Sequence, residues 1–379
     1  MIDLMKIPFF EPSIEKEDKK IISEVLSNAY LTDGPKLLEF EKKFSKLTNS
    51  KFSVGVSNAT SALLLSLKAI GIQKGDEVII PDMTFIATAS AVILSGGVPV
   101  LADIKNNDLT ISPSSIEKSI TKKTKAIIVV HFAGTPCDMS KIKRIAKKNN
   151  LKIIEDCAHA IGTYYKMKHV GTFGDAGCFS FYPTKNITTL EGGMIVSNNK
   201  KISEYVRKSR NHGITRTLSQ RYSKGNPWDY DIIEPGYNFR LDEIRSTLGI
   251  NQLKRIKKIN SKRRSICQYY NEKIKNIPGI KIPEIFPKDA VHSCHLYIVR
   301  ITKEYELSRD KVVKKLEKKG IRTTVHYKPL HQFTVIKKYA KRIDSLNNSK
   351  QAFNEIISLP LFLQLTKPQI DYVVNNIKK

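Results

Sequence analysis

A lysine and an acidic pair stand at the ends of two apolar runs in the middle of the chain. Lys185 follows the run Cys178–Tyr182, and the turn Glu191-Gly192-Gly193 then leads into a second apolar run. Upstream, the run Leu151–Ile154 ends in Glu155-Asp156. An amine can form a Schiff base with an aldehyde, and a carboxylate can keep a ring nitrogen protonated. A pyridoxal phosphate (PLP) enzyme needs both groups, so this pair predicts PLP chemistry.

The elements that would position this pair alternate between strand and helix from about residue 50 to 200. Alternation of this kind predicts an α/β fold with a mostly parallel sheet flanked by helices. No helix pattern separates the last two apolar runs, so we expect them to pair as a hairpin and leave one antiparallel strand. The predicted sheet has seven strands: Phe52–Val56, Glu77–Ile80, Val98–Ala102, Ala126–Phe132, Lys152–Ile154, Gly177–Tyr182 and Gly193–Val196.

The pattern changes after Pro278-Gly279 to that of a smaller α+β domain. Strands are expected at His295–Ile301 and Ile321–Val325, with a helix at Ser308–Lys318 between them. A chain of 379 residues is also too long for one compact core of ordinary size. We therefore predict a large PLP-binding domain at residues 1–255, which includes the N-terminal segment, and a small C-terminal domain at 256–379.

Composition narrows the protein class. The net charge of +28 could indicate nucleic-acid binding, but the lysines are spread along the whole chain, which favours a solvated basic surface. No apolar run reaches the length of a membrane span, and the N-terminus lacks a signal-peptide pattern. The five cysteines show no metal-type spacing. We expect a reduced, cytoplasmic protein with no metal site, no nucleic-acid partner and no membrane partner.

Two candidate cofactor contacts come from the first strand-to-helix connections. In an open α/β sheet, ligands bind beyond the carboxyl ends of the strands. Thr60 and Ser61 open a helix there and could bind a phosphate, although an ordinary helix cap is the alternative. Phe85 follows the next strand and could stack on a planar ring, although core packing is the usual role of a lone phenylalanine.

The other candidates lie around the acidic pair and the lysine. Asp156 could bind a pyridinium nitrogen, Ala158 is small enough to let a ring lie flat, and His159 could reach a phenolic oxygen. Ser180 and Lys185 form the last piece. Taken singly, Asp156 is more often a helix cap, a lone histidine is more often a structural polar residue, and a lysine in so basic a chain is usually at the surface. Their joint order at successive strand ends is what predicts a cofactor site.

Over nearly its whole length the chain resembles the DegT/DnrJ/EryC1/StrS family of PLP-dependent sugar aminotransferases, which has the aspartate aminotransferase fold (fold type I). The pieces Ser180-Phe181-Tyr182-x-x-Lys185 and Glu191-Gly192-Gly193 are the most specific. The resemblance is carried by Tyr30–Pro35, Asn58–Leu63, Pro81–Ala87, Val130-His131, Gly134, Asp138-Met139, Ile154–Ala160, Phe179–Met194, Gly236–Arg240, Gln252-Leu253, Val325–His331 and Ser358–Leu361.

The resemblance implies a role for each matching residue at the cofactor ring. Lys185 would be the Schiff-base lysine and the general acid and base. Asp156 would bind the pyridine nitrogen, with Ala158 beneath the ring. His159 would contact the ring hydroxyl, and Phe85 would stack on the ring.

At the other end of the cofactor, the resemblance implies phosphate contacts from Thr60, Ser61 and Ser180. Asn238 would reach the phosphate from the other subunit, which implies a homodimer with shared active sites. The sequence departs from the family pattern at Ala59 and Leu190, where the family commonly has glycine. If Ala59 needs a positive φ, its backbone would be strained by roughly 1 kcal/mol.

The implied activity is transfer of an amino group from an amino acid, glutamate by resemblance, to a nucleotide-linked keto sugar. The product would be an amino sugar nucleotide for surface glycan synthesis, with His326 and His331 as candidate substrate contacts. Alternatives are a related PLP sugar dehydratase, an aminobenzoate-type synthase, or a non-enzymatic PLP-binding regulator. Some members of the family replace the lysine with histidine and perform dehydration, so Lys185 favours transamination.

Overall fold

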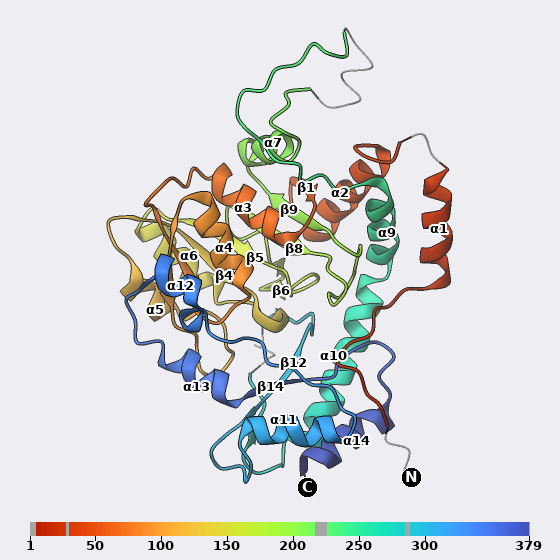
Figure 1. Ribbon diagram of the computed structural model, residues 1–379, viewed down its shortest axis with the longest axis vertical. Coiled ribbons are helices and arrows are strands. Elements are labelled where there is room, and N and C mark those ends of the chain that lie inside the picture. The colour runs from red at the N-terminus through yellow and green to blue at the C-terminus, as the bar shows by residue number, and fades with distance from the viewer. Residues whose placement is uncertain (1–4, 28–29, 217–225, 285–288, 379) are drawn as a thin grey trace.

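The large lobe is built around an eight-stranded sheet (Figure 1). The structure is a computed structural model that describes residues 5–27, 30–216, 226–284 and 289–378. The strands follow the order β1-β9-β8-β5-β4-β2-β3-β13. Their bounds are β1 (Phe52–Val56), β2 (Glu77–Pro81), β3 (Val98–Ala102), β4 (Thr124–Val130), β5 (Lys152–Asp156), β8 (Ala176–Ser180), β9 (Gly193–Ser197) and β13 (Lys341–Arg342).

The sheet confirms the predicted α/β fold class. All seven strands predicted for this sheet are present, and β9 runs antiparallel to β8, as the predicted hairpin requires, and also to β1. The eighth strand, β13, was not predicted. It comes from the C-terminal third of the chain and pairs parallel with β3 over two residues, Lys341 and Arg342. Both residues are basic, so no apolar run in the sequence marks this strand.

Helices cover both faces of the sheet because its strands alternate buried side chains between two cores. One core packs β-strand residues such as Ile154 and Cys178 against α3 (Ala59–Ala69), α4 (Ile86–Ser95) and α7 (Lys200–Ser209). Their neighbours Ile153 and Phe179 point to the opposite face. That face is covered by α2 (Pro35–Thr48), α5 (Pro113–Ser119), α6 (Met139–Lys148) and α9 (Glu243–Lys254).

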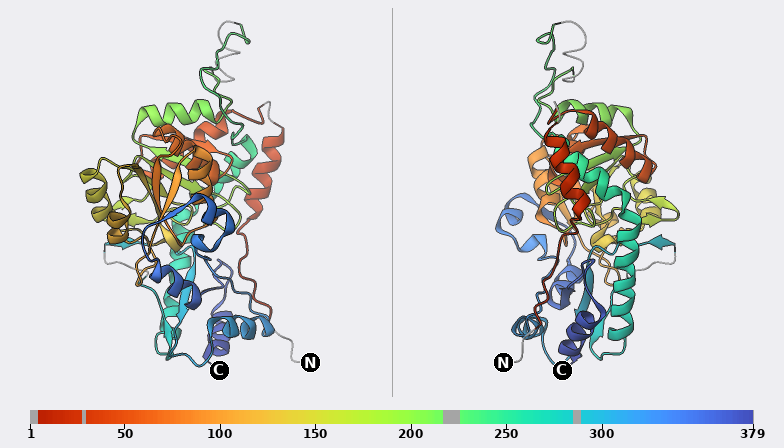
Figure 2. Two further views of the ribbon diagram at one scale, coloured as in Figure 1. Left: turned by 60° about the vertical axis from the view of Figure 1, so that its left-hand side comes forward. Right: turned by 90° about the vertical axis from the view of Figure 1, so that its right-hand side faces the viewer.

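A long helical segment joins the two lobes (Figure 2). α9 and α10 (Ile256–Ile274) meet at Arg255, whose Nη2 lies 2.7 Å from Asp18 Oδ2 of α1 (Lys16–Leu26). The first turns of α10 pack in the large lobe, and its later turns pack in the small lobe. The division at residues 255 and 256 remains our proposal for the domain boundary.

The small lobe has a three-stranded antiparallel sheet made of β10 (Ile280–Lys281), β12 (Tyr297–Ile301) and β14 (Ile356–Leu359). α11 (Arg309–Lys318) and α14 (Lys367–Lys378) pack against it with α10. The prediction of a strand at Ile321–Val325 was wrong. Where the structure describes the chain, this segment makes only isolated bridges, from Ile321 to Ile7 of the N-terminal segment and from Thr324 to Ser358.

Short elements complete the fold. A small sheet contains β6 (Tyr164–Tyr165), β7 (Lys168–His169) and β11 (Ala290–Val291). The remaining helical segments are the 3-10 turns η1 (Phe132–Gly134) and η2 (Leu330–Gln332) and the helices α12 (Thr334–Tyr339) and α13 (Asn347–Glu355). All five cysteines are buried and form no disulfide. Within the described ranges, no helix has the length and apolar character needed to cross a bilayer.

Candidate active site

The site is built where the parallel strands of the large sheet end. Asp156 closes β5, and it lies between Val130 at the end of β4 and Cys178 of β8 in the sheet register. Ser180 closes β8, and Lys185 follows it. The structure thus brings the acid and the lysine to one edge of the sheet, on neighbouring strands.

Asp156 is buried and held by two hydrogen bonds. Its Oδ2 accepts from Thr88 Oγ1 at 3.0 Å, and its Oδ1 accepts from the Ala158 N–H at 3.1 Å. Burial raises the pKa of Asp156, while these hydrogen bonds and the charge of Lys185 oppose the rise. Among the described residues no cationic side chain forms an ion pair with this carboxylate. A protonated ring nitrogen would supply the missing positive charge.

Lys185 is partly buried beside this acid. Burial lowers the pKa of Lys185 to about 8, and the negative charge of Asp156 opposes the shift. At neutral pH a larger fraction of its amine is therefore neutral than for an exposed lysine. A neutral amine is the form that attacks an aldehyde and accepts a proton.

His159, three residues after the acid, contacts an aromatic residue from the small lobe. Its Nδ1 accepts from the Ala133 N–H at 3.2 Å, so the ring proton is assigned to Nε2, which lies 3.1 Å from Tyr327 Oη. Burial holds the pKa of His159 well below its usual range, and the ring is neutral. Tyr327 in turn lies against the exposed ring of Phe85, with centroids 5.9 Å apart.

The start of α3 forms the other end of the site. Asn58 caps this helix by accepting from the Ser61 N–H at 2.8 Å. Within the described parts of the chain, no hydrogen-bond acceptor is found for the backbone N–H groups of Ala59 and Thr60. Free N–H groups at a helix N-terminus are donors for an anion. Ala59 is helical without a positive φ, so the condition for backbone strain at this residue is not met.

Ser180 lies close to the start of α3 because its partner on the neighbouring strand, Gly193, has no side chain. Ser180 pairs with Gly193 across β8 and β9. A Cβ on Gly193 would lie 2.5 Å from the carbonyl carbon of Asn58, so the helix start packs directly on this strand. Thr60, Ser61 and Ser180 are therefore gathered at one corner. Leu190, in the preceding turn, does have a left-handed backbone with φ of 69°.

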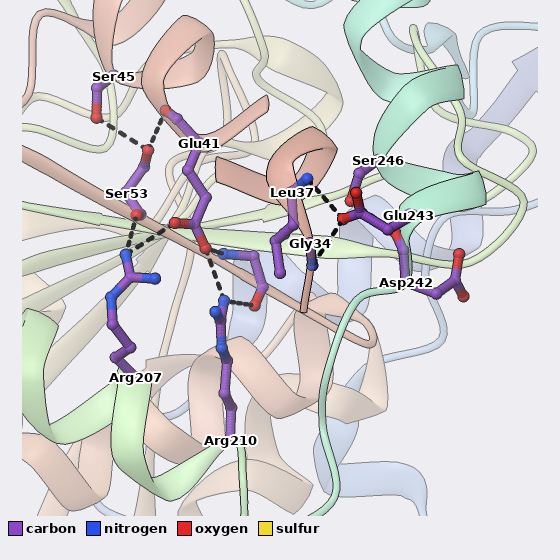
Figure 3. Close-up of polar contacts among 11 residues, drawn as sticks. Gly34, Leu37, Glu41, Ser45, Ser53, Arg207, Arg210, Asp242, Glu243 and Ser246 are labelled. Carbon is purple, nitrogen blue, oxygen red and sulfur yellow. Dashed lines mark hydrogen bonds and ion pairs between the residues drawn. The ribbon is translucent and has the colours of Figure 1, made fainter. Parts of the chain in front are cut away.

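A buried ion cluster fixes the elements around this corner (Figure 3). Glu41 of α2 accepts from Arg210 at 2.7 Å and from Arg207 at 2.8 Å, and Arg210 also donates to the Gly55 carbonyl of β1 at 2.6 Å. The Arg210 carbonyl accepts from the Phe239 N–H at 2.8 Å. The cluster therefore joins α2, α7 and β1 to the segment that carries the phosphate candidate Asn238.

The start of α2 is fixed by a second carboxylate, that of Glu243 (Figure 3). Glu243 of α9 accepts from the N–H groups of Gly34, Lys36 and Leu37, at 3.2, 2.8 and 2.9 Å. A carboxylate at a helix N-terminus satisfies free N–H groups and suits the helix dipole. The first turn of α2 is thus tied to α9.

Asn238 has an exposed side chain beside the α3 start of its own chain. The Ser57 N–H donates to the Phe239 carbonyl at 2.8 Å, and residue 238 forms an isolated bridge with Asn211. No second chain is needed to bring this segment to the corner. The expected contact of Asn238 with the phosphate of a partner remains a prediction.

The two histidine candidates for substrate contact have different surroundings. His326 lines a cavity next to Lys185, and its Nδ1 lies 2.8 Å from Ser358 Oγ. His331 instead binds Asp82: its ring Nδ1 lies 2.7 Å from Oδ2, and its backbone N–H donates to Oδ1 at 2.9 Å. Its ring thus has a structural partner at the end of β2, and the structure does not bring it to the lysine cavity.

The sequence reasoning missed Thr88 and Tyr327 as site residues. Thr88 lies one helical turn after Phe85, which is a signal that the sequence does hold. Tyr327 reaches His159 from the other lobe, 168 residues away in sequence, so no local pattern could reveal the contact. Thr88 orients Asp156, and Tyr327 completes the polar chain to His159.

Glu155, the other member of the acidic pair, has a structural role. Its carboxylate accepts from His131 and from the N–H groups of Gly171, Phe173 and Gly174, at 2.6 to 3.0 Å. Burial acts to raise the pKa of Glu155, but these hydrogen bonds hold it below its usual value. The group His131, Glu155 and Cys157 has metal-ligand chemistry, yet the carboxylate is already occupied by these four donors.

The residues fit PLP. As far as the structure describes the chain, Asp156 has no ion pair and the α3 N-terminus offers unpaired N–H donors to a phosphate, while Lys185 has a lowered pKa. Lys185 would bind the aldehyde carbon and Asp156 the ring nitrogen. When bound, PLP supplies an electron sink at the carbon that loses a proton.

Comparisons with known proteins agree with this fit. The DegT/DnrJ/EryC1/StrS aminotransferase family matches residues 12–378. The spore coat polysaccharide biosynthesis protein SpsC of Bacillus subtilis is 35% identical over 375 residues, which are 98% of this chain and 96% of that protein.

Solved structures extend the similarity to three dimensions. Spr1654 of Streptococcus pneumoniae, assigned as a sugar aminotransferase, has a TM-score of 0.92 in its PMP form, with 30% identity and 98% of each chain covered. It is also solved in a PLP form. PseC of Helicobacter pylori, an aminotransferase involved in the biosynthesis of pseudoaminic acid, has a TM-score of 0.91, 32% identity and 98% coverage of each chain. The chain therefore belongs to the DegT/DnrJ/EryC1/StrS aminotransferase family, has the fold type I architecture, and uses PLP as its cofactor.

Proposed function

We propose that the protein transfers the amino group of an amino acid, glutamate as the first candidate, to a keto sugar carried on a nucleotide. The observation that carries the proposal is the partly buried amine of Lys185 with its lowered pKa, next to the unpaired buried acid Asp156. The sugar as substrate is supported by family membership and by similarity to SpsC and PseC. A role in surface glycan synthesis is part of the proposal.

Each site residue then has a task. Lys185 binds the cofactor and afterwards moves a proton between the substrate carbon and the cofactor, which its pKa of about 8 permits near neutral pH. Asp156, oriented by Thr88 and Ala158, keeps the ring nitrogen protonated. Neutral His159 donates a hydrogen bond toward the ring hydroxyl or Tyr327.

The remaining candidates hold the cofactor and the substrate. Thr60, Ser61 and Ser180 bind the phosphate at the α3 corner, with Phe85 over the ring. His326 contacts substrate from the small lobe. The proposed role of His331 in substrate binding has less support, because Asp82 already binds its ring.

We also propose a homodimer in which Asn238 of one subunit completes the phosphate site of the other. Support comes from exposed apolar side chains in three stretches of the large lobe, because exposed apolar side chains that lie together usually mark an interface. These side chains are Tyr30, Leu31, Leu38, Tyr182, Leu190, Trp228, Tyr230, Ile232 and Ile233. A cytoplasmic location, where nucleotide-linked sugars are made, is part of the same proposal.

The test uses both halves of the reaction. Holoenzyme is first mixed with L-glutamate, and release of 2-oxoglutarate with loss of the PLP absorbance is followed. The resulting PMP form is then offered a panel of keto sugar nucleotides. The proposal predicts that at least one restores the PLP absorbance and yields an amino sugar nucleotide by mass. A PMP form that no keto sugar nucleotide reoxidises would reject the substrate class, and dehydrated sugar without keto-acid release would indicate the dehydratase alternative.

A further inference from the structure

A small cavity opens between the lobes beside the Lys185 amine. Its volume is about 70 Å³. Lys185 belongs to the large lobe, whereas Arg263, His295 and His326 come from the small lobe and the helix that leads to it. Phe9 of the N-terminal segment also lines it. A space of this size holds a group of a few atoms next to the reacting amine.

Arg263 is a cation in this wall without a counter-ion. Its side chain is 4% exposed. Nε donates to the Cys294 carbonyl at 2.7 Å, and Nη2 donates to the carbonyls of His295 and Leu361 at 2.7 and 3.2 Å. Across the described residues, Arg263 forms no ion pair, and no acceptor is found for Nη1.

Burial lowers the pKa of Arg263 to about 10, which still leaves the guanidinium charged at neutral pH. A buried charge without an opposite charge is costly for a folded protein. Such a cost is understandable where the charge has a ligand to bind. Here the three carbonyl acceptors fix the guanidinium plane and leave Nη1 as the remaining donor nitrogen.

His326 offers a second donor to the same cavity. Ser358 Oγ lies 2.8 Å from its Nδ1, and with the serine donating, the ring proton sits on Nε2. Burial lowers the pKa of His326 to about 4, so the ring is neutral at pH 7. A cation and a neutral N–H donor together suit a planar anion better than they suit a hydroxyl group.

We propose that this cavity binds the α-carboxylate of the amino donor, held by Nη1 of Arg263 and Nε2 of His326. The proposal rests on the aminotransferase function proposed above. An α-carboxylate is one bond from the carbon that exchanges a proton with Lys185, so it must bind within a few ångströms of that amine. The keto sugar has no such carboxylate, and Arg263 therefore serves only the half of the reaction that uses the amino acid.

The test compares L-glutamate with 4-aminobutyrate, which is glutamate without its α-carboxylate. Loss of the PLP absorbance is followed for each compound, over hours where needed. We expect Arg263→Met to lower the kcat/KM for glutamate about 100-fold and to leave that for 4-aminobutyrate within about twofold. Arg263→Lys, which keeps the charge but not the planar donors, should lose about tenfold on glutamate alone.

Arg264→Met is the matched control, because the neighbouring Arg264 lines a separate outer groove and donates only to the His292 carbonyl. It should match the wild type with both compounds. If Arg263→Met does not fold, the same comparison of the two compounds is made with Arg263→Lys and His326→Ala. Each variant is used only if the absorbance spectrum of its bound PLP is intact.

Equal losses on both compounds, or no loss on either, would overturn the carboxylate site while the aminotransferase proposal stands. A wild-type holoenzyme that transfers no amino group from any L-amino acid would instead reject the proposed function itself. A loss confined to the later reaction with the keto sugar nucleotide would mean that the cavity binds a phosphate of that substrate, and would also overturn the proposal.

Discussion

Lys185 and Asp156 show how burial prepares single residues for proton transfer. Burial lowers the pKa of the amine to about 8 and raises that of the acid, while the opposite charge of each partner limits the shift of the other. With a pKa of about 8 instead of 10.5, the neutral fraction of the amine near pH 7 is about 300-fold larger. The amine is therefore reactive before any cofactor binds.

The pH dependence of PLP uptake by apoenzyme tests this shift. Only the neutral amine attacks the aldehyde, so the uptake rate should rise with pH with a midpoint of about 8. Asp156→Asn removes the negative charge that raises the pKa of Lys185, and its midpoint should move below that of the wild type. Stopped-flow absorbance across pH 6 to about 11 measures both midpoints. A wild-type midpoint near 10.5, the value of an exposed lysine, would contradict the account.

The placement of candidate residues was predictable where they lie at or just after the end of a strand. Asp156 and Ser180 end their strands and Lys185 follows shortly after, and the sheet topology then brings them to one edge. Tyr327 and Arg263 could not be predicted, because their positions depend on how the small lobe packs against the large one. The role of His331 stays a prediction, and its bond to Asp82 could not be predicted from the sequence because the two residues are 249 positions apart.

At the scale of elements, the contact between α3 and β9 decides the shape of the phosphate corner. Gly193 lets the helix start lie on the strand, and a Cβ there would meet Asn58 backbone atoms at 2.5 Å and the Ala59 nitrogen at 2.9 Å. Backbone atoms of a capped helix cannot rotate away as a flexible side chain would. The corner is therefore intolerant of a single methyl group.

Gly193→Ala should move the start of α3 and weaken cofactor binding. We expect the Kd for PLP to rise about tenfold or more, and the free energy of unfolding to fall by about 1–3 kcal/mol. Titration of apoenzyme with PLP and urea denaturation measure the two effects. Met194→Leu, a volume-conserving change at the next position of β9, is the control and should change neither by much. Unaltered PLP affinity in Gly193→Ala would contradict the assigned corner.

Most elements of the large lobe were predictable from their periodicity, since each of its main strands is buried and rich in apolar residues. The exceptions are instructive. β13 is two exposed basic residues paired with the sheet edge, which no hydrophobic pattern marks. Residues 321–325 do have a strand-like pattern, but their neighbours Ile7 and Ser358 offer only single bridges.

At the scale of the whole molecule, exposed side chains beside the α3 corner bear on how two copies of the chain would meet. Asn238 is exposed beside this corner, and Tyr182 and Leu190, also exposed, flank the lysine in sequence. A second copy of the chain would cover such side chains and close the site. The proposed shared site therefore predicts a dimer in solution.

Mixing two inactive variants tests whether the sites are shared. Lys185→Ala lacks the amine and Asn238→Ala lacks the proposed phosphate contact. If Asn238 acts across the interface, a mixed dimer has one site with both native residues, and a reassorted equal mixture should regain about a quarter of wild-type activity. Analytical ultracentrifugation checks the dimer and steady-state assays check the activity. A mixture no more active than its separate components would show that Asn238 serves its own chain.

The most direct measurement of the central claim is covalent trapping of the cofactor on the native protein. Holoenzyme is reduced with borohydride and digested, and the peptides are analysed by mass spectrometry. The account predicts a phosphopyridoxyl group on Lys185, and no specific label in the Lys185→Ala variant. A label on a different lysine, or a purified protein that takes up no PLP at all, would contradict it.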